Sequence, residues 1–117
     1  MDFSRYENLR ALVRANFSET TQRLVDEALE YADGKLAGVC RYDGAPMLDH
    51  AAAVASIVIS EVGLGRNSAV SSILHDVVRL AHKERPGGEF LALTEEIRNR
   101  FGEQVVGITM GLANISE

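Results

Sequence analysis

The sequence predicts a single all-helical domain, and three observations support this fold class. The chain has 117 residues, which is the usual size of one domain with one core. Apolar residues recur at steps of three and four along most of the chain, and the alternation typical of a strand never persists. Turn-forming residues separate these apolar stretches. We therefore expect a bundle of about six helices.

Two helices are predicted in the N-terminal third. The first runs over about 4–15, and Ser18 is then typical of an N-cap, with Glu19 in the first turn, where the helix dipole favours a negative charge. The second helix continues across Gly34, which costs about 1 kcal/mol but need not end a helix. The predicted apolar faces are Leu9, Leu12 and Val13 in the first helix and Val25, Leu29, Ala32, Leu36 and Val39 in the second.

The middle of the chain predicts a loop over 41–46 and two further helices. The third helix runs from about Asp49 to Glu61, and Gly63 is placed to cap its C-terminus. The fourth starts at Asn67 or Ser68 and runs to about Lys83. The predicted buried positions are Val54, Ile57 and Val58 in the third helix and Val70, Ile73, Leu74 and Val77 in the fourth.

The last two helices follow the strongest breaker in the chain, Pro86-Gly87-Gly88. Thr94 predicts an N-cap for a fifth helix that ends at Gly102, and a sixth helix begins near Glu103. The apolar residues of the sixth helix are Val105, Val106, Ile108 and Met110. The chain stops soon afterwards, at Glu117, which fits both a natural domain end and a piece of a longer protein.

Composition excludes several classes of partner and location. The formal charge is -5 and no basic patch interrupts it, so we expect neither nucleic acid nor an anionic membrane as a partner. Cys40 is the only cysteine, which rules out an intramolecular disulfide and fits a reducing cytoplasm. The most apolar run, Ala51 to Ile59, is far shorter than the roughly 20 residues that span a bilayer.

The residues with metal-binding chemistry are His50, His75 and Asp76. Imidazole nitrogens and a carboxylate suit Mn, Fe or Zn, and two antiparallel helices joined by a short turn would bring the three together. A charged pair inside an apolar helix is costly to bury unless a partner compensates it. The alternative is that all three are hydrogen-bonded core residues with no ion. His82 lies about 10.5 Å along the helix from His75 and cannot share the same ion.

Four segments resemble one family. The run RYDGAPMLDH (41–50) is similar to the pattern R-x-S-G-E-P-Y-I-x-H, and ILHDVV (73–78) is similar to L-L-H-D-V-V. Residues 94–97 and 101–108 resemble the next helix and the F-G-x-x-V-x-x-L-V segment that follows. Over roughly Leu24 to Leu112 the chain thus resembles the N-terminal HD hydrolase-type domain of the RelA/SpoT homologues.

The resemblance carries expectations about fold, ligands and partners. Proteins of that family make and degrade guanosine tetra- and pentaphosphate in the stringent response. Their HD domain removes the 3'-pyrophosphate with Mn2+, and a separate domain performs the synthesis. The resemblance implies that residues 1–117 form the N-terminal part of an HD-domain helical bundle that lacks the C-terminal helices of the complete domain.

Residue by residue, the resemblance implies a site for one metal ion and a nucleotide. His50, His75 and Asp76 would be ligands of Mn2+, and Arg41 would pack against the guanine base of a nucleotide such as guanosine tetraphosphate or GTP. A planar, weakly hydrated guanidinium suits stacking on a purine. The alternative for Arg41 is a solvated loop residue. The implied partner domain is the synthetase domain of the parent chain.

The chain also departs from the family pattern. Active members have Glu-Asp after H-D-V-V, whereas this chain has Arg79 and Leu80, and neither side chain can act as a general base. The fourth metal ligand of the family, a downstream aspartate, would lie beyond Glu117. Three ligands make a weaker and more open site. The loop differs from the pattern at Asp43, Ala45 and Met47, which weakens the expectation of nucleotide binding.

Three hypotheses for function follow. The first is a fragment of a GTP pyrophosphokinase (GTP diphosphokinase) with a degenerate, inactive hydrolase site, in which the domain restrains or orients the synthetase domain. The second is a Mn-dependent guanosine tetraphosphate 3'-pyrophosphohydrolase that is active when full length and uses Asp49 or Glu84 as the base. The third is a metal-free helical interaction module. Both the first and the third predict self-association into a homo-oligomer through exposed apolar surface.

Overall fold

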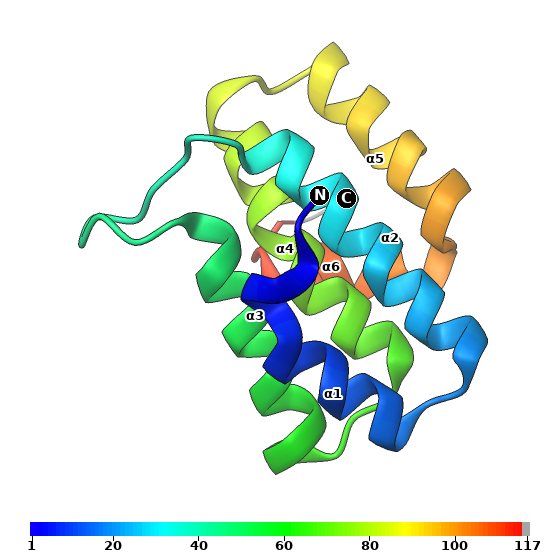
Figure 1. Cartoon of the computed structure of the whole chain (residues 1–117). Coiled ribbons are helices and arrows are strands. Elements are labelled where there is room, and N and C mark those ends of the chain that lie inside the picture. The colour runs from blue at the N-terminus through cyan, green and yellow to red at the C-terminus, as the bar shows by residue number, and fades with distance from the viewer. Residues whose placement is uncertain (116–117) are drawn as a thin grey trace.

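The computed structural model describes residues 1–115 and shows an all-helical bundle, as the sequence predicts (Figure 1). A short 3-10 turn at Phe3–Tyr6 precedes the first helix, and a π-helical turn at Val58–Val62 follows the third. The described part contains no strand, only one isolated bridge between Cys40 and Pro46. The six α-helices are α1 (Glu7–Asn16), α2 (Glu19–Leu36), α3 (Met47–Ile57), α4 (Arg66–Glu84), α5 (Gly88–Phe101) and α6 (Glu103–Leu112).

Helix α4 forms the centre of the bundle. It packs against α2, α3, α5 and α6 (Figure 1). All ten residues from Ala69 to Val78 are buried, as expected for a helix that is covered on every side. The His75–Asp76 pair therefore lies in the most deeply buried stretch of the chain. The predicted core positions of this helix, from Val70 to Val77, are confirmed.

Several predicted helix ends are confirmed. The Ser18 hydroxyl accepts a hydrogen bond from the backbone N–H of Thr21 at 3.3 Å and so caps α2. Gly34 lies inside α2, as predicted. Gly63 follows the π-helical turn with a φ of 74°, a conformation that glycine adopts without strain. Helix α2 nevertheless ends at Leu36, earlier than the apolar pattern indicates, because the chain turns at Gly38 with a φ of 77°.

The predicted start of the fifth helix was wrong. Helix α5 begins at Gly88 and not at Thr94, because Gly87, with a φ of 95°, completes the turn and the helix starts at once. Thr94 lies in the middle of the helix, where its hydroxyl donates to the carbonyl of Phe90 at 2.9 Å. Threonine can bond either to a helix start or back to the preceding turn, so its presence alone does not mark a boundary.

The predicted apolar face of the third helix was also wrong. Ile57 is 50% exposed, and Val54 and Val58 are only half buried. The helix buries its small residues instead, and Ile59, four residues after Ala55, continues the same face in the π-helical turn. The buried residues of this segment are Leu48, Ala51, Ala52, Ala55 and Ile59.

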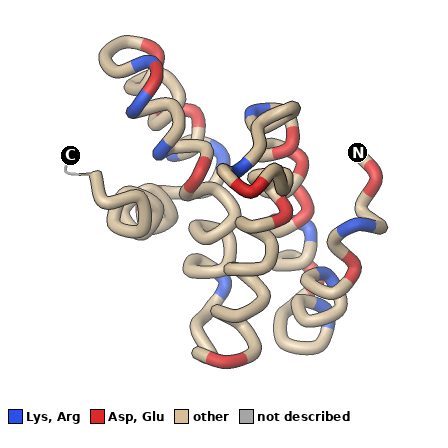
Figure 2. Tube along the Cα trace, turned by 90° about the vertical axis from the view of Figure 1, so that its left-hand side faces the viewer, with Lys and Arg blue, Asp and Glu red and all other residues tan. Residues whose placement is uncertain are grey.

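The loop between α2 and α3 projects from the bundle, as Figure 1 shows. Its two ends are held together because the N–H of Arg41 donates to the carbonyl of Ala45 at 2.8 Å and the N–H of Met47 donates to the carbonyl of Val39 at 3.0 Å. Acidic and basic residues are interspersed along the chain (Figure 2). No helix in the part that the structure describes has the length and apolar character needed to cross a membrane.

Candidate metal centre

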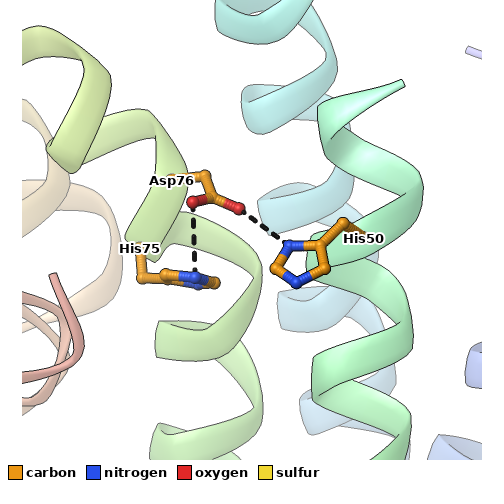
Figure 3. Close-up of side chains that lie close together, drawn as sticks. All are labelled: His50, His75 and Asp76. Carbon is orange, nitrogen blue, oxygen red and sulfur yellow. Dashed lines mark hydrogen bonds and ion pairs between the residues drawn. The ribbon is translucent and has the colours of Figure 1, made fainter. Parts of the chain in front are cut away.

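The structure brings His50, His75 and Asp76 together (Figure 3). His50 lies in the first turn of α3, whereas His75 and Asp76 lie in the middle of α4. One ligand atom from each residue lies within 4.8 Å of the other two. His50 Nδ1 is 3.3 Å from Asp76 Oδ2, and His75 Nε2 is 3.4 Å from Asp76 Oδ1. The predicted convergence of these three side chains is confirmed, and their role as ligands stays a prediction.

The arrangement of α3 and α4 explains this convergence. The two helices run in opposite directions along one another, joined by the π-helical turn and a short link (Figure 1). The start of α3 therefore faces the later part of α4. Most of the buried residues of α3 are alanines, which allow two helix backbones to approach closely. His50 can then reach Asp76 although the two residues are 26 positions apart.

A backbone contact sets the tautomer of His75. Its Nδ1 lies 2.5 Å from the carbonyl oxygen of Ser72, and a carbonyl can only accept, so Nδ1 carries the hydrogen. The electron pair of Nε2 then faces the Asp76 carboxylate, which is unfavourable unless a proton or a cation lies between them. A histidine that donates one ring N–H to a carbonyl and offers the other nitrogen is the usual form of a metal ligand. The donor set therefore fits a divalent cation such as Mn2+.

The carboxylate of Asp76 is buried, so its negative charge needs a partner. Asp76 is 3% exposed and His75 is 6% exposed, while the side chain of His50 is 30% exposed. A buried carboxylate is costly unless it is paired or bound to a metal. The cluster is thus open to solvent beside His50 and closed on the α4 side.

Arg79 is the cationic partner of Asp76. One guanidinium nitrogen donates to Asp76 Oδ1 at 3.1 Å, and the other donates to the carbonyl of Leu112 at 3.3 Å. The sequence identified Arg79 only as a departure from the family pattern, and this ion pair was missed. Its signal was the three-residue spacing, which places two helical side chains side by side. The Ser72 carbonyl was missed too, because backbone atoms leave no mark in a sequence.

The two acids considered as substitute bases lie elsewhere. Asp49 forms an ion pair with Arg5 and accepts a hydrogen bond from the Tyr6 hydroxyl at 3.0 Å. Burial and this hydrogen bond raise the pKa of Tyr6 to about 12. Glu84 and Leu80 line a groove of about 480 Å³ between α2, α4 and α5. Neither acid belongs to the three-residue cluster within residues 1–115.

The remaining candidates lie outside the cluster. Arg41 lies in the projecting loop, where its guanidinium is 5.6 Å from the centre of the Tyr42 ring. Tyr42 is 94% exposed, so this contact does not fix Arg41 beside the cluster. His82 packs edge-on against the ring of Phe90 at 5.0 Å and is not part of the three-residue cluster, which agrees with the sequence analysis.

Comparison with known proteins identifies the family. Residues 28–117 match the family model described as "HD domain", and this stretch includes all three members of the cluster. The chain is also similar to the "Probable GTP pyrophosphokinase" of Mycobacterium leprae (strain TN), with 33% identity over 103 residues. That similarity covers 88% of this chain but only 12% of the relative, so the chain spans a small part of the relative's length. From the family match we conclude that this chain belongs to the HD domain family.

Proposed function

We propose that this chain is the HD domain of a RelA/SpoT-type protein and that it binds a divalent cation without hydrolysing guanosine tetraphosphate. One observation carries the proposal: the three donors converge within 4.8 Å, but the residue beside them is a guanidinium where active members have an acid. The similarity to a relative named as a GTP pyrophosphokinase supports the assignment to this type of protein.

The donor set accounts for binding. His50, His75 and Asp76 would hold Mn2+, which when bound supplies a Lewis acid for a phosphoryl oxygen and favours ionisation of a water molecule. Ser72 orients His75 through its carbonyl, and Asp76 supplies the only carboxylate of the cluster among residues 1–115. These residues can position a cation, and with it a phosphate group.

The same residues do not account for turnover. A general base must be able to accept a proton within hydrogen-bond reach of the attacking water. Arg79 has only donors, and Leu80 is an alkyl group that lines the groove between α2, α4 and α5. Asp49 is already paired with Arg5 and Tyr6. The described residues therefore supply a binding site without a base.

The biological role that fits such a site is regulatory. We propose a parent protein that acts mainly as a cytoplasmic GTP pyrophosphokinase, in which this domain restrains or orients the synthetase domain. A guanine nucleotide would be its ligand, with Arg41 in the projecting loop available for stacking on the base. The ion pair between Arg79 and Asp76 also favours a second candidate, a metal-free helical module, because it compensates the buried carboxylate without an ion.

The experiment is an assay of pyrophosphate release from guanosine tetraphosphate with the purified chain and Mn2+. We expect no release above background from the wild-type chain. A second sample carries Arg79→Glu and Leu80→Asp, which restore the acids of the family pattern; release from this variant alone would attribute the lost activity to these two positions. Mn2+-dependent release from the wild-type chain, abolished by His75→Ala, would contradict the proposal.

A further inference from the structure

The charge balance of the cluster depends on Arg79. Asp76 is nearly fully buried and carries the only negative charge of the three donors. Arg79 donates to Asp76 Oδ1, the same oxygen that lies 3.4 Å from His75 Nε2. The Arg79 guanidinium and a metal ion held by the three donors would therefore both interact with the Asp76 carboxylate.

Arg79 is also held in place from its other side. The second guanidinium nitrogen donates to the carbonyl of Leu112, the last residue of α6. The last carbonyls of a helix have no partner within the helix, and the helix dipole makes that end negative, so both partners of Arg79 attract a positive charge. A guanidinium with two such partners is fixed beside the cluster, although its side chain is 52% exposed.

We propose that Arg79 is the internal counter-ion of this site and that it sets the affinity for divalent cations by competing for Asp76. In the metal-free protein Arg79 compensates the buried carboxylate. A divalent ion at the three donors would share the Asp76 carboxylate with Arg79 and lie a few ångströms from its positive charge. Both effects weaken binding relative to a site with a neutral residue at this position. The inference rests on the proposed metal site, of which it names the controlling residue.

The test measures Mn2+ affinity by isothermal titration calorimetry in four variants besides the wild-type chain. Arg79→Gln and Arg79→Met remove the charge, and Arg79→Lys keeps it. Arg66→Gln is the matched control, since it removes one positive charge from the same helix about 20 Å away. We expect Arg79→Gln and Arg79→Met to bind Mn2+ about tenfold more tightly than the wild-type chain, and Arg66→Gln and Arg79→Lys to remain near wild type.

Thermal unfolding followed by circular dichroism provides the second readout, because it shows whether each variant is folded. Without metal, the neutral variants at position 79 should unfold at a lower temperature, since Asp76 loses its partner. Added Mn2+ should raise their unfolding midpoint by more than that of the wild-type chain. Equal affinity in the wild-type chain and both neutral variants, or no binding in any of them, would overturn the inference.

The two proposals fail in different ways. Hydrolysis of guanosine tetraphosphate by the wild-type chain contradicts the proposed function whatever Arg79 does. Unchanged Mn2+ affinity in the Arg79 variants, with no hydrolysis by the wild-type chain, overturns only the role of Arg79 as a competitor. Tighter binding in Arg79→Gln with no hydrolysis supports both.

Discussion

Helices α3 and α6 both pack against α4, but they do so with different kinds of residue. Helix α6 uses Val105, Val106 and Met110, which are all buried, and the Ser71 hydroxyl donates to the carbonyl of Val105 at 3.1 Å. Helix α3 uses mainly alanines and contributes His50 to the polar cluster. Large apolar side chains remove more area from water and so contribute more to stability. We infer that α6 mainly stabilises the fold, whereas α3 mainly builds the site.

The largest effect on the free energy of unfolding is expected for a substitution in α6. Val105 is fully buried, and Val105→Ala should lower the free energy of unfolding by about 2 kcal/mol through lost burial and the cavity that remains. Urea unfolding followed by circular dichroism is the suitable measurement, because the chain has no tryptophan. The Mn2+ affinity of the folded protein should stay unchanged. A strong loss of Mn2+ affinity in this variant would contradict the inference that α6 mainly stabilises the fold and α3 mainly builds the site.

A smaller effect is expected where the N-terminus holds the start of α3. Tyr6→Phe removes the hydrogen bond to Asp49, one residue before His50, and should cost about 1 kcal/mol. Because the pKa of Tyr6 is raised to about 12 in the folded protein, this stabilisation is present below the unfolded value near 10. It is lost as the pH rises from about 10 to about 12.

Urea unfolding of the wild-type chain and Tyr6→Phe between pH 8 and 12 measures this dependence. Burial raises the pKa of Tyr31 as well, so stability should fall in both proteins, but less steeply in Tyr6→Phe. Parallel pH curves for the two proteins would show that Tyr6 does not contribute to the anchoring of α3.

The smallest effect on the free energy of unfolding is expected in α2, outside the contacts that α3 and α6 make with α4. Gly34 is exposed in α2, and a Cβ at this position would meet no atom within 4 Å. Gly34→Ala should therefore stabilise the protein, by at most about 1 kcal/mol, because alanine loses less conformational freedom in a helix. The same unfolding assay measures it, and Mn2+ affinity is the control that should not change. A loss of stability would show that α2 is strained at this position.

Prediction from the sequence succeeded where one physical signal dominated. The core of α4 followed from apolar periodicity, and the convergence of His50 with Asp76 followed from two helices joined by a short turn. The face of α3 was missed because most of its buried residues are small alanines, whereas the prediction followed the larger apolar residues Val54, Ile57 and Val58. The start of α5 was missed because Thr94 bonds to the preceding turn instead of capping a helix.

Only part of the candidate site could be predicted from the sequence. The metal-binding residue types can be recognised in a motif, but the counter-ion of the buried carboxylate depends on which side chain reaches it in the fold. Arg79 was recognised as a residue that cannot act as a base, and its bond to Asp76 became evident only with the helix geometry. Its second bond, to the carbonyl of Leu112, joins residues 33 positions apart and leaves no trace in the local sequence.

The central claim is that His50, His75 and Asp76 together bind one divalent cation. The most direct measurement is the Mn2+ stoichiometry and affinity of the purified chain beside His75→Ala, with His82→Ala as the control that removes a histidine outside the cluster from the same helix. We predict one Mn2+ per chain in the wild-type protein and in His82→Ala, and a loss of more than about 100-fold in affinity in His75→Ala. Equal Mn2+ binding in all three proteins, or none in the wild-type chain, would contradict the claim.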